Sequence, residues 1–238
     1  MASKQFALDE RTSITVYKRK TSRNLRLSVS ADGKIRVSIP VWAPYRTGVA
    51  FAQKRRDWIE QQRKPQALLV NGQAVGKAHR LQFVQNSAID ALKSSVRSTE
   101  VIVRVPEGMS LSDTEVQEVA RKACVRALRS EAQQLLPQRL KILAEQHRFE
   151  YTSVAIKQLR SRWGSCDQNG HIVLNLYLMQ LPWESIDYVL LHELTHTKYL
   201  HHGPIFWGAM EEVLPDVKQR RAAMRSHQPI LHAPLAQV

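Results

Sequence analysis

Cysteine is scarce in this chain of 238 residues, and the two that occur lie far apart. Cys124 and Cys166 belong to no Cys-x-x-Cys pattern, which argues against a disulfide framework and against a cysteine-rich metal site. No stretch approaches the roughly 18 apolar residues that a membrane span needs. The N-terminal residues also lack the apolar core of a signal peptide. From these absences we expect a cytoplasmic protein with two reduced thiols and no membrane span.

Acidic residues are also few. The chain has 21 Asp and Glu against 35 Lys and Arg, which gives a net charge of +14. Residues 1–66 alone hold 15 Lys and Arg against 5 Asp and Glu, a net charge of +10. Such a field attracts nucleic acid, an anionic membrane surface or an acidic protein. Because no RNP, C2H2 or basic-zipper pattern accompanies the charge, a solvated basic surface on an enzyme is the favoured interpretation and nucleic-acid binding the alternative.

The first half of the sequence reads as mainly β. Residues 14–18, 24–30 and 34–39 alternate apolar with polar side chains and predict an antiparallel meander, with a turn at Ala31-Asp32-Gly33. A surface helix is expected from Pro44 to about Lys64-Pro65. Further on, an Asn-Gly turn within residues 67–85 and a strand at residues 101–105 continue the β pattern.

The second half has a different pattern. A capping box at residues 112–115 opens a predicted helix of about 35 residues that runs to His147. Strands are expected at residues 151–158 and 171–178, followed by a helix from Pro182 and, after Gly203-Pro204, a last amphipathic stretch. The expected organisation is a basic β-rich region at 1–110, a second domain at 111–226 and a loose tail at 227–238.

The helix after Pro182 carries the pattern His192-Glu193-Leu194-Thr195-His196. Positions i and i+4 lie about 40° apart around a helix axis, so both imidazoles point to one side and can bind one ion. Glu193 projects beside the open coordination position. There it can act as the catalytic base and take a proton from water whose pKa a zinc ion has lowered.

A catalytic zinc commonly has three protein ligands, so a third is needed. The candidates are His201, His202, Glu211 and Glu212. We favour His202 because it follows His192 by ten residues, the offset of the HExxHxxGxxH enzymes, and because Gly203-Pro204 lets the chain turn back. Tyr199 stands where those enzymes have a glycine, which leaves the path of the backbone between His196 and His202 open.

An ordered set of motifs surrounds the two histidines. They are Arg160-Ser161-Arg162-Trp163-Gly164-Ser165-Cys166, then Asn175, then Ile186-Asp187-Tyr188-Val189, then His202-Gly203-Pro204-Ile205-Phe206-Trp207, then Pro215-Asp216. With these motifs the chain resembles the YgjP-like metallopeptidases, which are near the WLM and SprT-like zincins. The resemblance implies an α+β fold with a zincin-like metallopeptidase domain at residues 111–226, one Zn²⁺ held by His192, His196 and His202, and Glu193 as the base.

The same resemblance implies a peptide or protein substrate. An edge strand within residues 172–177 would pair with an extended peptide. Arg160 and Arg162 are candidates for binding a substrate carboxylate or an oxyanion, although they could instead fix their loop.

Three further polar side chains are candidates for contacting substrate. The phenols of Tyr188 and Tyr199 could donate to a tetrahedral intermediate, or pack beside the site. Asn175 could orient substrate, or simply tie a strand.

Other side chains near the motif are expected to have structural roles. Trp163 is expected to pack, and Phe206 and Trp207 to anchor the last helix to the core. Asp187 and Asp216 could orient a ligand histidine, but surface charge or capping is the favoured interpretation for both.

We therefore expect a zinc metallopeptidase that hydrolyses peptide bonds by Glu-assisted attack of water. The alternative is a nucleic-acid-associated protein that binds through its basic N-terminal region and acts on proteins attached to nucleic acid, as SprT-like relatives do.

Overall fold

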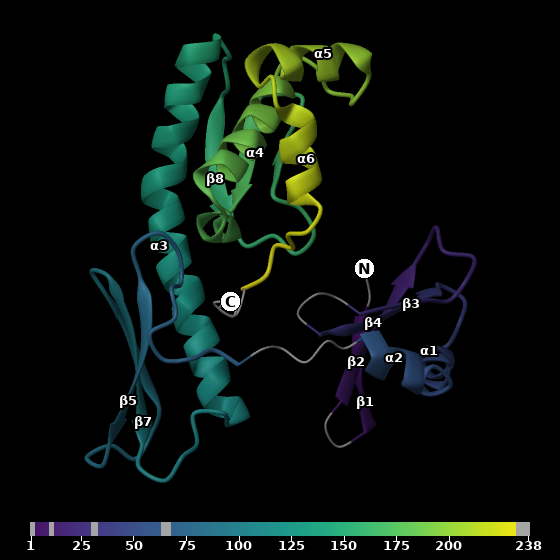
Figure 1. Cartoon of the computed structure of the whole chain (residues 1–238). Coiled ribbons are helices and arrows are strands. Elements are labelled where there is room, and N and C mark those ends of the chain that lie inside the picture. The colour runs from purple at the N-terminus through teal and green to yellow at the C-terminus, as the bar shows by residue number, and fades with distance from the viewer. Residues whose placement is uncertain (1–2, 10–11, 30–32, 63–67, 232–238) are drawn as a thin grey trace. The chain divides into compact units, whose positions relative to one another are not determined.

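The structure is a computed structural model that describes residues 3–9, 12–29, 33–62 and 68–231 (Figure 1). It has the expected α+β composition and divides into two compact units, Met1–Gln66 and Ala67–Val238. We call these the N-terminal unit and the C-terminal unit. Each has its own cluster of buried hydrophobic side chains. Within the described residues, no helix is both long and apolar enough to cross a bilayer.

The N-terminal unit contains a four-stranded sheet in the order β1-β2-β4-β3. Its strands are β1 (Ser3–Asp9), β2 (Thr12–Arg19), β3 (Arg26–Val29) and β4 (Ile35–Pro40). The predicted antiparallel meander is wrong, because β2 and β4 pair in parallel and β3 lies at the edge. The reason is burial: Ile35, Val37 and Ile39 are almost fully buried, so β4 takes a central position. Ala31 and Asp32 of the predicted turn lie outside the described residues.

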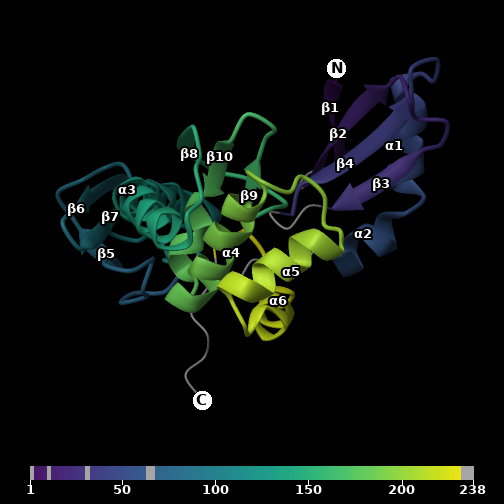
Figure 2. The same ribbon diagram turned by 90° about the horizontal axis from the view of Figure 1, so that it is seen from above.

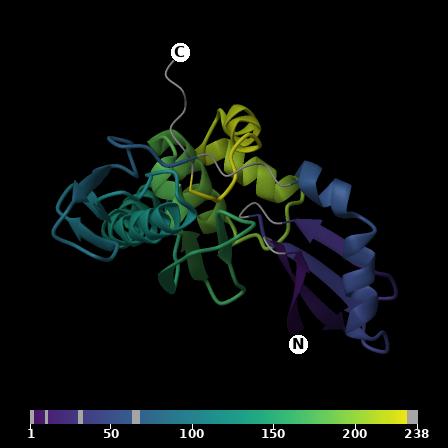
Figure 3. The same ribbon diagram turned by 90° about the horizontal axis from the view of Figure 1, so that it is seen from below.

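Two short helices, α1 (Tyr45–Gln53) and α2 (Arg56–Gln62), replace the single helix expected after Pro44. The predicted end at Lys64-Pro65 lies outside the described residues. Figure 3 shows both helices on one side of the sheet. Contact is close at Gly48, where an added Cβ would lie 2.7 Å from Cγ1 of Val16. Glycine at this position therefore lets α1 approach the sheet.

In the C-terminal unit, a long helix lies between two small sheets. This helix, α3 (Thr114–His147), has 34 residues, close to the predicted length. One sheet contains β5 (Arg80–Asn86), β6 (Lys93–Arg97) and β7 (Glu100–Pro106) in the order β5-β7-β6. Figure 2 looks along α3 and shows this sheet on one side of the helix and the second sheet on the other. Residues 68–106 thus belong with α3, whereas the sequence led us to expect a division near residue 110.

A buried carboxylate ties the segment before β5 to α3. Glu131 is 4% exposed and accepts hydrogen bonds from the backbone amides of Lys77, Ala78 and His79 at 2.6–3.1 Å and from Nδ1 of His79 at 2.6 Å. Gln117 makes a second connection, since its amide group bonds both backbone polar groups of Leu69. These bonds cross about fifty positions of sequence, which is why no local pattern predicted them.

The second sheet lies against the C-terminal half of α3. It contains β8 (Ser153–Lys157), β9 (Gly164–Cys166) and β10 (His171–Asn175) in the order β8-β10-β9. A short 3-10 helix, η1 (Leu176–Gln180), follows where the strand was expected to continue. Then come α4 (Trp183–Thr195), α5 (Pro204–Val213) and α6 (Val217–Met224). The predicted helix after Pro182 is confirmed, and α6 was not anticipated.

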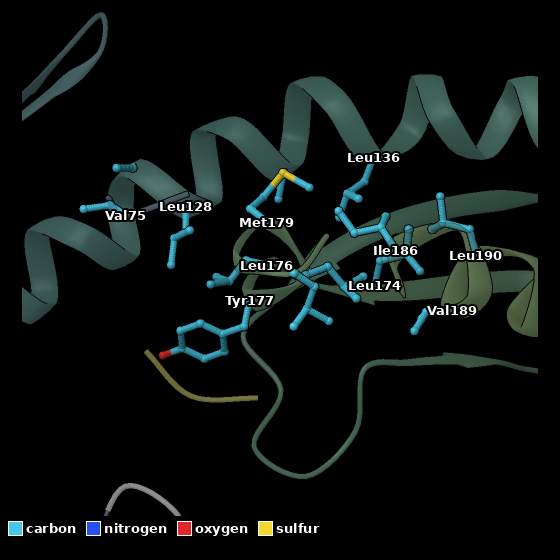
Figure 4. Close-up of a cluster of buried hydrophobic side chains, with 14 of the residues drawn as sticks. Val75, Leu128, Leu136, Leu174, Leu176, Tyr177, Met179, Ile186, Val189 and Leu190 are labelled. Atoms are coloured by element: carbon cyan, nitrogen blue, oxygen red, sulfur yellow. The ribbon is translucent and has the colours of Figure 1, made fainter. Parts of the chain in front are cut away.

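The core of this unit fixes α4 against α3 and the sheet. Figure 4 shows Leu128 and Leu136 of α3 facing Leu174, Leu176, Ile186 and Leu190. All six are fully buried. After α6 the chain returns to η1, where Nε2 of Gln180 donates to the carbonyl of Ile230 at 2.8 Å. The part of the expected loose tail that the structure describes is thus held to the unit.

Candidate metal centre

The last turn of α4 presents two histidines on one side of the helix. The opposite side is apolar, and Ile186, Leu190 and Leu194 are fully buried in the core. Because His192 and His196 are one turn apart, their rings meet at 4.8 Å between centroids. The helix thus fixes two imidazoles at the edge of the core, with His192 and His196 half-buried.

A third imidazole, from His202, completes a triangle. The Nε2–Nε2 distances are 3.2 Å between His192 and His196, 3.1 Å between His196 and His202, and 3.0 Å between His202 and His192. Of the described residues, these three form the cluster whose ligand atoms could hold one metal ion. The competing third ligands stay out of it: His201 and Glu212 are exposed, and Glu211 pairs with Lys218 at 3.0 Å.

The backbone between His196 and His202 turns without a glycine. The amides of Lys198 and Tyr199 both donate to the carbonyl of Thr195, at 3.1 and 2.9 Å, which closes a tight turn after α4. Tyr199 is not among the described non-glycine residues with positive φ. A tyrosine therefore fits where the analogous spacing has glycine. Lys198 supports the turn by donating from Nζ to the carbonyl of Arg148, at the C-terminal end of α3.

Two of the imidazoles favour the neutral form that a metal ligand requires. Nδ1 of His196 lies 3.0 Å from the carbonyl oxygen of Tyr199, which only accepts, so Nδ1 carries the proton and Nε2 keeps its lone pair. Burial, together with the neighbouring His196, His202 and Arg221, lowers the pKa of His192 to about 3. Because each Nε2 atom lies within 3.2 Å of the other two, a cation among them would remove the repulsion between facing lone pairs.

The spacing fits zinc. A tetrahedron with Zn–N bonds of about 2.0–2.1 Å has N–N edges of about 3.3 Å, close to the 3.0–3.2 Å between the three Nε2 atoms. All three donors are nitrogen, as in catalytic three-histidine zinc sites.

Two aromatic side chains of α5 hold the imidazoles in place. Phe206 is fully buried and its ring centroid lies 4.6–5.0 Å from those of all three histidines. Trp207 stacks on His202 and donates from Nε1 to its carbonyl at 3.2 Å. Both residues anchor α5, as expected, and their rings also pack against the three-histidine cluster.

Glu193 lies beside the cluster in a tight space. Its side chain is 5% exposed, and a Cβ added to Gly164 of β9 would come within 2.6 Å of its Oε1. Glycine at position 164 therefore makes room for the carboxylate. Burial raises the pKa of Glu193 to about 8, with Arg162 acting in the opposite direction.

The expected substrate strand needs a correction. Residues 172–177 are not at an edge, because β10 pairs with β8 on one side and β9 on the other. The edge strand next to Glu193 is β9, which has β10 as its one neighbour in the three-stranded sheet. A short strand at the end of a loop gives little alternation, so the sequence pattern did not reveal it.

Among the candidate substrate residues, Asn175 and Tyr188 are buried, whereas Arg160, Arg162 and Tyr199 are exposed. Asn175 is fully buried: its Nδ2 donates to the carbonyls of Leu159 and Arg162 at 2.9 Å, so it holds the loop before β9. Arg160 and Arg162 are exposed on this loop. Tyr188 is 7% exposed and its ring lies 6.0 Å from that of His192, whereas Tyr199 is 36% exposed.

Asp187 and Asp216 pair with arginines and not with the three histidines. Asp187 forms a bidentate ion pair with Arg139 of α3, at 2.6 and 2.8 Å. Asp216 pairs with Arg220 at 2.7 Å. Surface pairing, rather than support of a ligand histidine, is therefore their role.

Arg221 of α6 was missed by the sequence analysis. Its guanidinium lies 4.3 Å from the ring centroid of Trp207, and its charge acts on both His192 and Tyr188. Helix α6 shows no motif that would have singled out this arginine. The site therefore has a cation on the α6 side in addition to Arg162 on the β9 side.

One protein-family model and several solved structures match the chain. No curated protein matches the chain. Among solved structures, it is similar to the metallopeptidase zymogen abylysin of Pyrococcus abyssi, at 24% identity and a TM-score of 0.33 over 43% of this chain and 93% of that one. The corresponding values for the metallopeptidase zymogen jannalysin of Methanocaldococcus jannaschii are 16%, 0.33, 43% and 94%. The model of the YgjP-like metallopeptidase domain matches residues 23–227, so the chain belongs to the YgjP-like metallopeptidase family.

Proposed function

We propose that this protein is a zinc-dependent peptidase, with one zinc per chain held by His192, His196 and His202 and with Glu193 as the catalytic base. The observation that carries the proposal is the convergence of three Nε2 atoms within 3.2 Å of one another beside a buried carboxylate. A site with three protein ligands leaves one coordination position for chemistry. A purely structural zinc site would have no use for that open position or for Glu193.

When bound, zinc supplies a Lewis acid that lowers the pKa of water and polarises a peptide carbonyl. Glu193, whose carboxylate form a bound cation would favour against the effect of burial, takes the proton from the attacking water and later passes it to the leaving amine. The near-complete burial of its carboxylate keeps bulk water from competing for that proton. Gly164 and the loop held by Asn175 keep the carboxylate in one place.

The substrate we propose is a peptide or protein that lies extended along β9. The free side of this edge strand offers main-chain hydrogen bonds that depend little on sequence. We propose that Arg160 and Arg162, on the loop leading into β9, bind a substrate carboxylate or the oxyanion. The phenols of Tyr188 and Tyr199 are candidate donors to the same oxyanion.

The test is Glu193→Gln, assayed on an unfolded protein substrate with zinc content measured on the same sample. We expect hydrolysis to fall by at least about a thousandfold while about one zinc per chain remains. Glu212→Gln, an exposed carboxylate on α5, is the matched control and should keep full activity. Activity that survives in the Glu193 variant would exclude Glu193 as the base.

A further inference from the structure

The sheet of the N-terminal unit has two faces of opposite character. Strand alternation places Phe6, Ile14, Val16, Val37 and Leu27 on the face that α1 and α2 cover. Among the described residues of this unit, no helix lies against the other face (Figure 3). We call this second surface the open face.

The open face is polar, basic and free of acidic side chains within the described strands. Alternation and register give its members as Ser3, Gln5, Ala7, Ser13, Thr15, Tyr17, Arg19, Arg26, Ser28, Arg36 and Ser38. Three of these are arginines and one is aromatic. Asp9 does not compensate them, because it forms an ion pair with Arg56 of α2, on the covered side.

Tyr17 lies in the middle of this surface. It pairs with Ser3 of β1 and Ser38 of β4, and Ser38 pairs in turn with Arg26 of β3. Arg19 stands two residues further along the same strand, and Arg36 is diagonal to Tyr17 on β4. At such positions Arg19 and Arg36 stand about 5–8 Å from Tyr17, and Arg26, two strands away, stands about 10 Å from it, so three arginines lie near a half-buried ring.

We propose that the open face binds single-stranded nucleic acid, with Tyr17 stacking on a base and Arg19, Arg26 and Arg36 contacting phosphates. Stacking on an aromatic ring needs an unpaired base, and the guanidinium fork suits phosphate oxygens. The net charge of +10 in residues 1–66 supplies the long-range attraction. A membrane surface would call for apolar side chains to insert, and Tyr17 is the one large apolar group on the open face of the described strands.

The experiment uses the full chain and fluorescein-labelled oligothymidylate and oligouridylate, with anisotropy titrations over a salt series. Arg26→Gln with Arg36→Gln should weaken binding at least tenfold and reduce the salt slope by about 1.4, since each phosphate contact in a single strand contributes about 0.7. The matched control, Arg46→Gln with Lys54→Gln, removes two charges from α1 and its C-terminal end, on the covered side. It should weaken binding less than about threefold.

The aromatic part of the proposal has its own variants. Tyr17→Val should weaken binding about tenfold, and Tyr17→Phe should keep it, because stacking needs the ring and not the hydroxyl. If Tyr17→Val unfolds the unit, as judged by circular dichroism, the two double variants decide alone.

Several outcomes would overturn the inference. Equal losses in the two double variants would mean a diffuse field rather than a site. Displacement by polyglutamate at the same charge concentration would mean an acidic-peptide surface, and binding to phosphatidylserine vesicles in preference to the oligonucleotides would mean a membrane surface. Glu193→Gln should bind both oligonucleotides as the wild type does, so this result and the peptidase result stand or fall separately.

Discussion

At the scale of single residues, the centre consists of groups that local sequence reveals and groups that it does not. His192, Glu193 and His196 follow from helical spacing alone, because one turn of helix fixes their directions. His202 depends on a turn whose hydrogen bonds to Thr195 appear only in the structure. The proximity of Gly164 to Glu193 joins two segments about thirty positions apart, and no spacing rule anticipates it.

The neighbouring residues His201 and His202 provide a matched pair of variants that tests which histidine is the third ligand. His202→Ala removes one of three donors, so we expect the purified protein to contain far less than one zinc per chain. His201→Ala is the matched control, and we expect it to keep about one zinc, because the exposed His201 is outside the cluster. Metal analysis by mass spectrometry measures both. Full zinc occupancy in the His202 variant would refute the three-histidine centre.

Gly164→Ala tests the space beside Glu193. The added methyl group would come within 2.6–2.9 Å of the carboxylate, so Glu193 must move. We expect kcat to fall at least tenfold with zinc content unchanged, because the three atoms nearest the added methyl group all belong to Glu193 and none to a ligand histidine. Gly208→Ala on α5 is the control: its Cβ would meet nothing within 4 Å, and activity should stay the same. Unchanged kcat in the Gly164 variant would show that the carboxylate tolerates displacement.

At the scale of elements, periodicity predicted helices better than it predicted sheets. The helix at Thr114–His147 and the helix after Pro182 were both expected, since each has a long amphipathic pattern. Strand pairing was not predictable. The parallel pairing of β2 with β4 and the central place of β10 depend on how the strands pack within the whole unit, and alternation within one strand does not encode its partners.

Glu131→Gln tests how the segment before β5 is joined to α3. Burial of Glu131 raises its pKa, but the hydrogen bonds from His79 and three backbone amides outweigh that effect and leave the pKa below its ordinary value of 4.5. A lowered folded-state pKa gives stability that is complete above the unfolded-state pKa and is lost as the pH falls through the folded-state value.

At pH 7 we therefore expect the Gln variant to lose about 3 kcal/mol of unfolding free energy, measured by urea denaturation. The difference in unfolding free energy between the wild type and the variant should narrow as the pH falls below about 4.5, where Glu131 begins to gain its proton in the unfolded state. Glu118→Gln, an exposed position on the same helix, should cost less than about 0.5 kcal/mol. A gap that widens on acidification would contradict the lowered pKa of Glu131.

At the scale of the whole molecule, most of the net positive charge lies in the N-terminal unit, whereas the three-histidine cluster lies in the C-terminal unit. Of the net charge of +14, residues 1–66 contribute +10. This leaves +4 for residues 67–238, which include the three histidines. The charge asymmetry was visible in the sequence. The division after Gln66 was not, because the strands of residues 80–106 resemble those of the N-terminal unit in pattern and differ from them in what they pack against.

A fragment of residues 67–238 should therefore fold by itself. Its hydrophobic cluster contains no residue from the N-terminal unit, so we expect a cooperative thermal transition, about one zinc per chain and retained peptidase activity. The fragment should also lose binding to oligothymidylate. Failure of the soluble fragment to hold zinc would show that residues 1–66 take part in forming the centre.

The central claim is that three imidazoles hold a zinc ion, and X-ray absorption at the zinc edge of the purified protein measures this most directly. We predict about one zinc per chain with a nitrogen and oxygen shell at about 2.0–2.1 Å and the multiple-scattering pattern of three histidines. Glu193→Gln should give the same spectrum of protein ligands. Absence of zinc, a two-histidine pattern or a sulfur shell near 2.3 Å from a cysteine would contradict the claim.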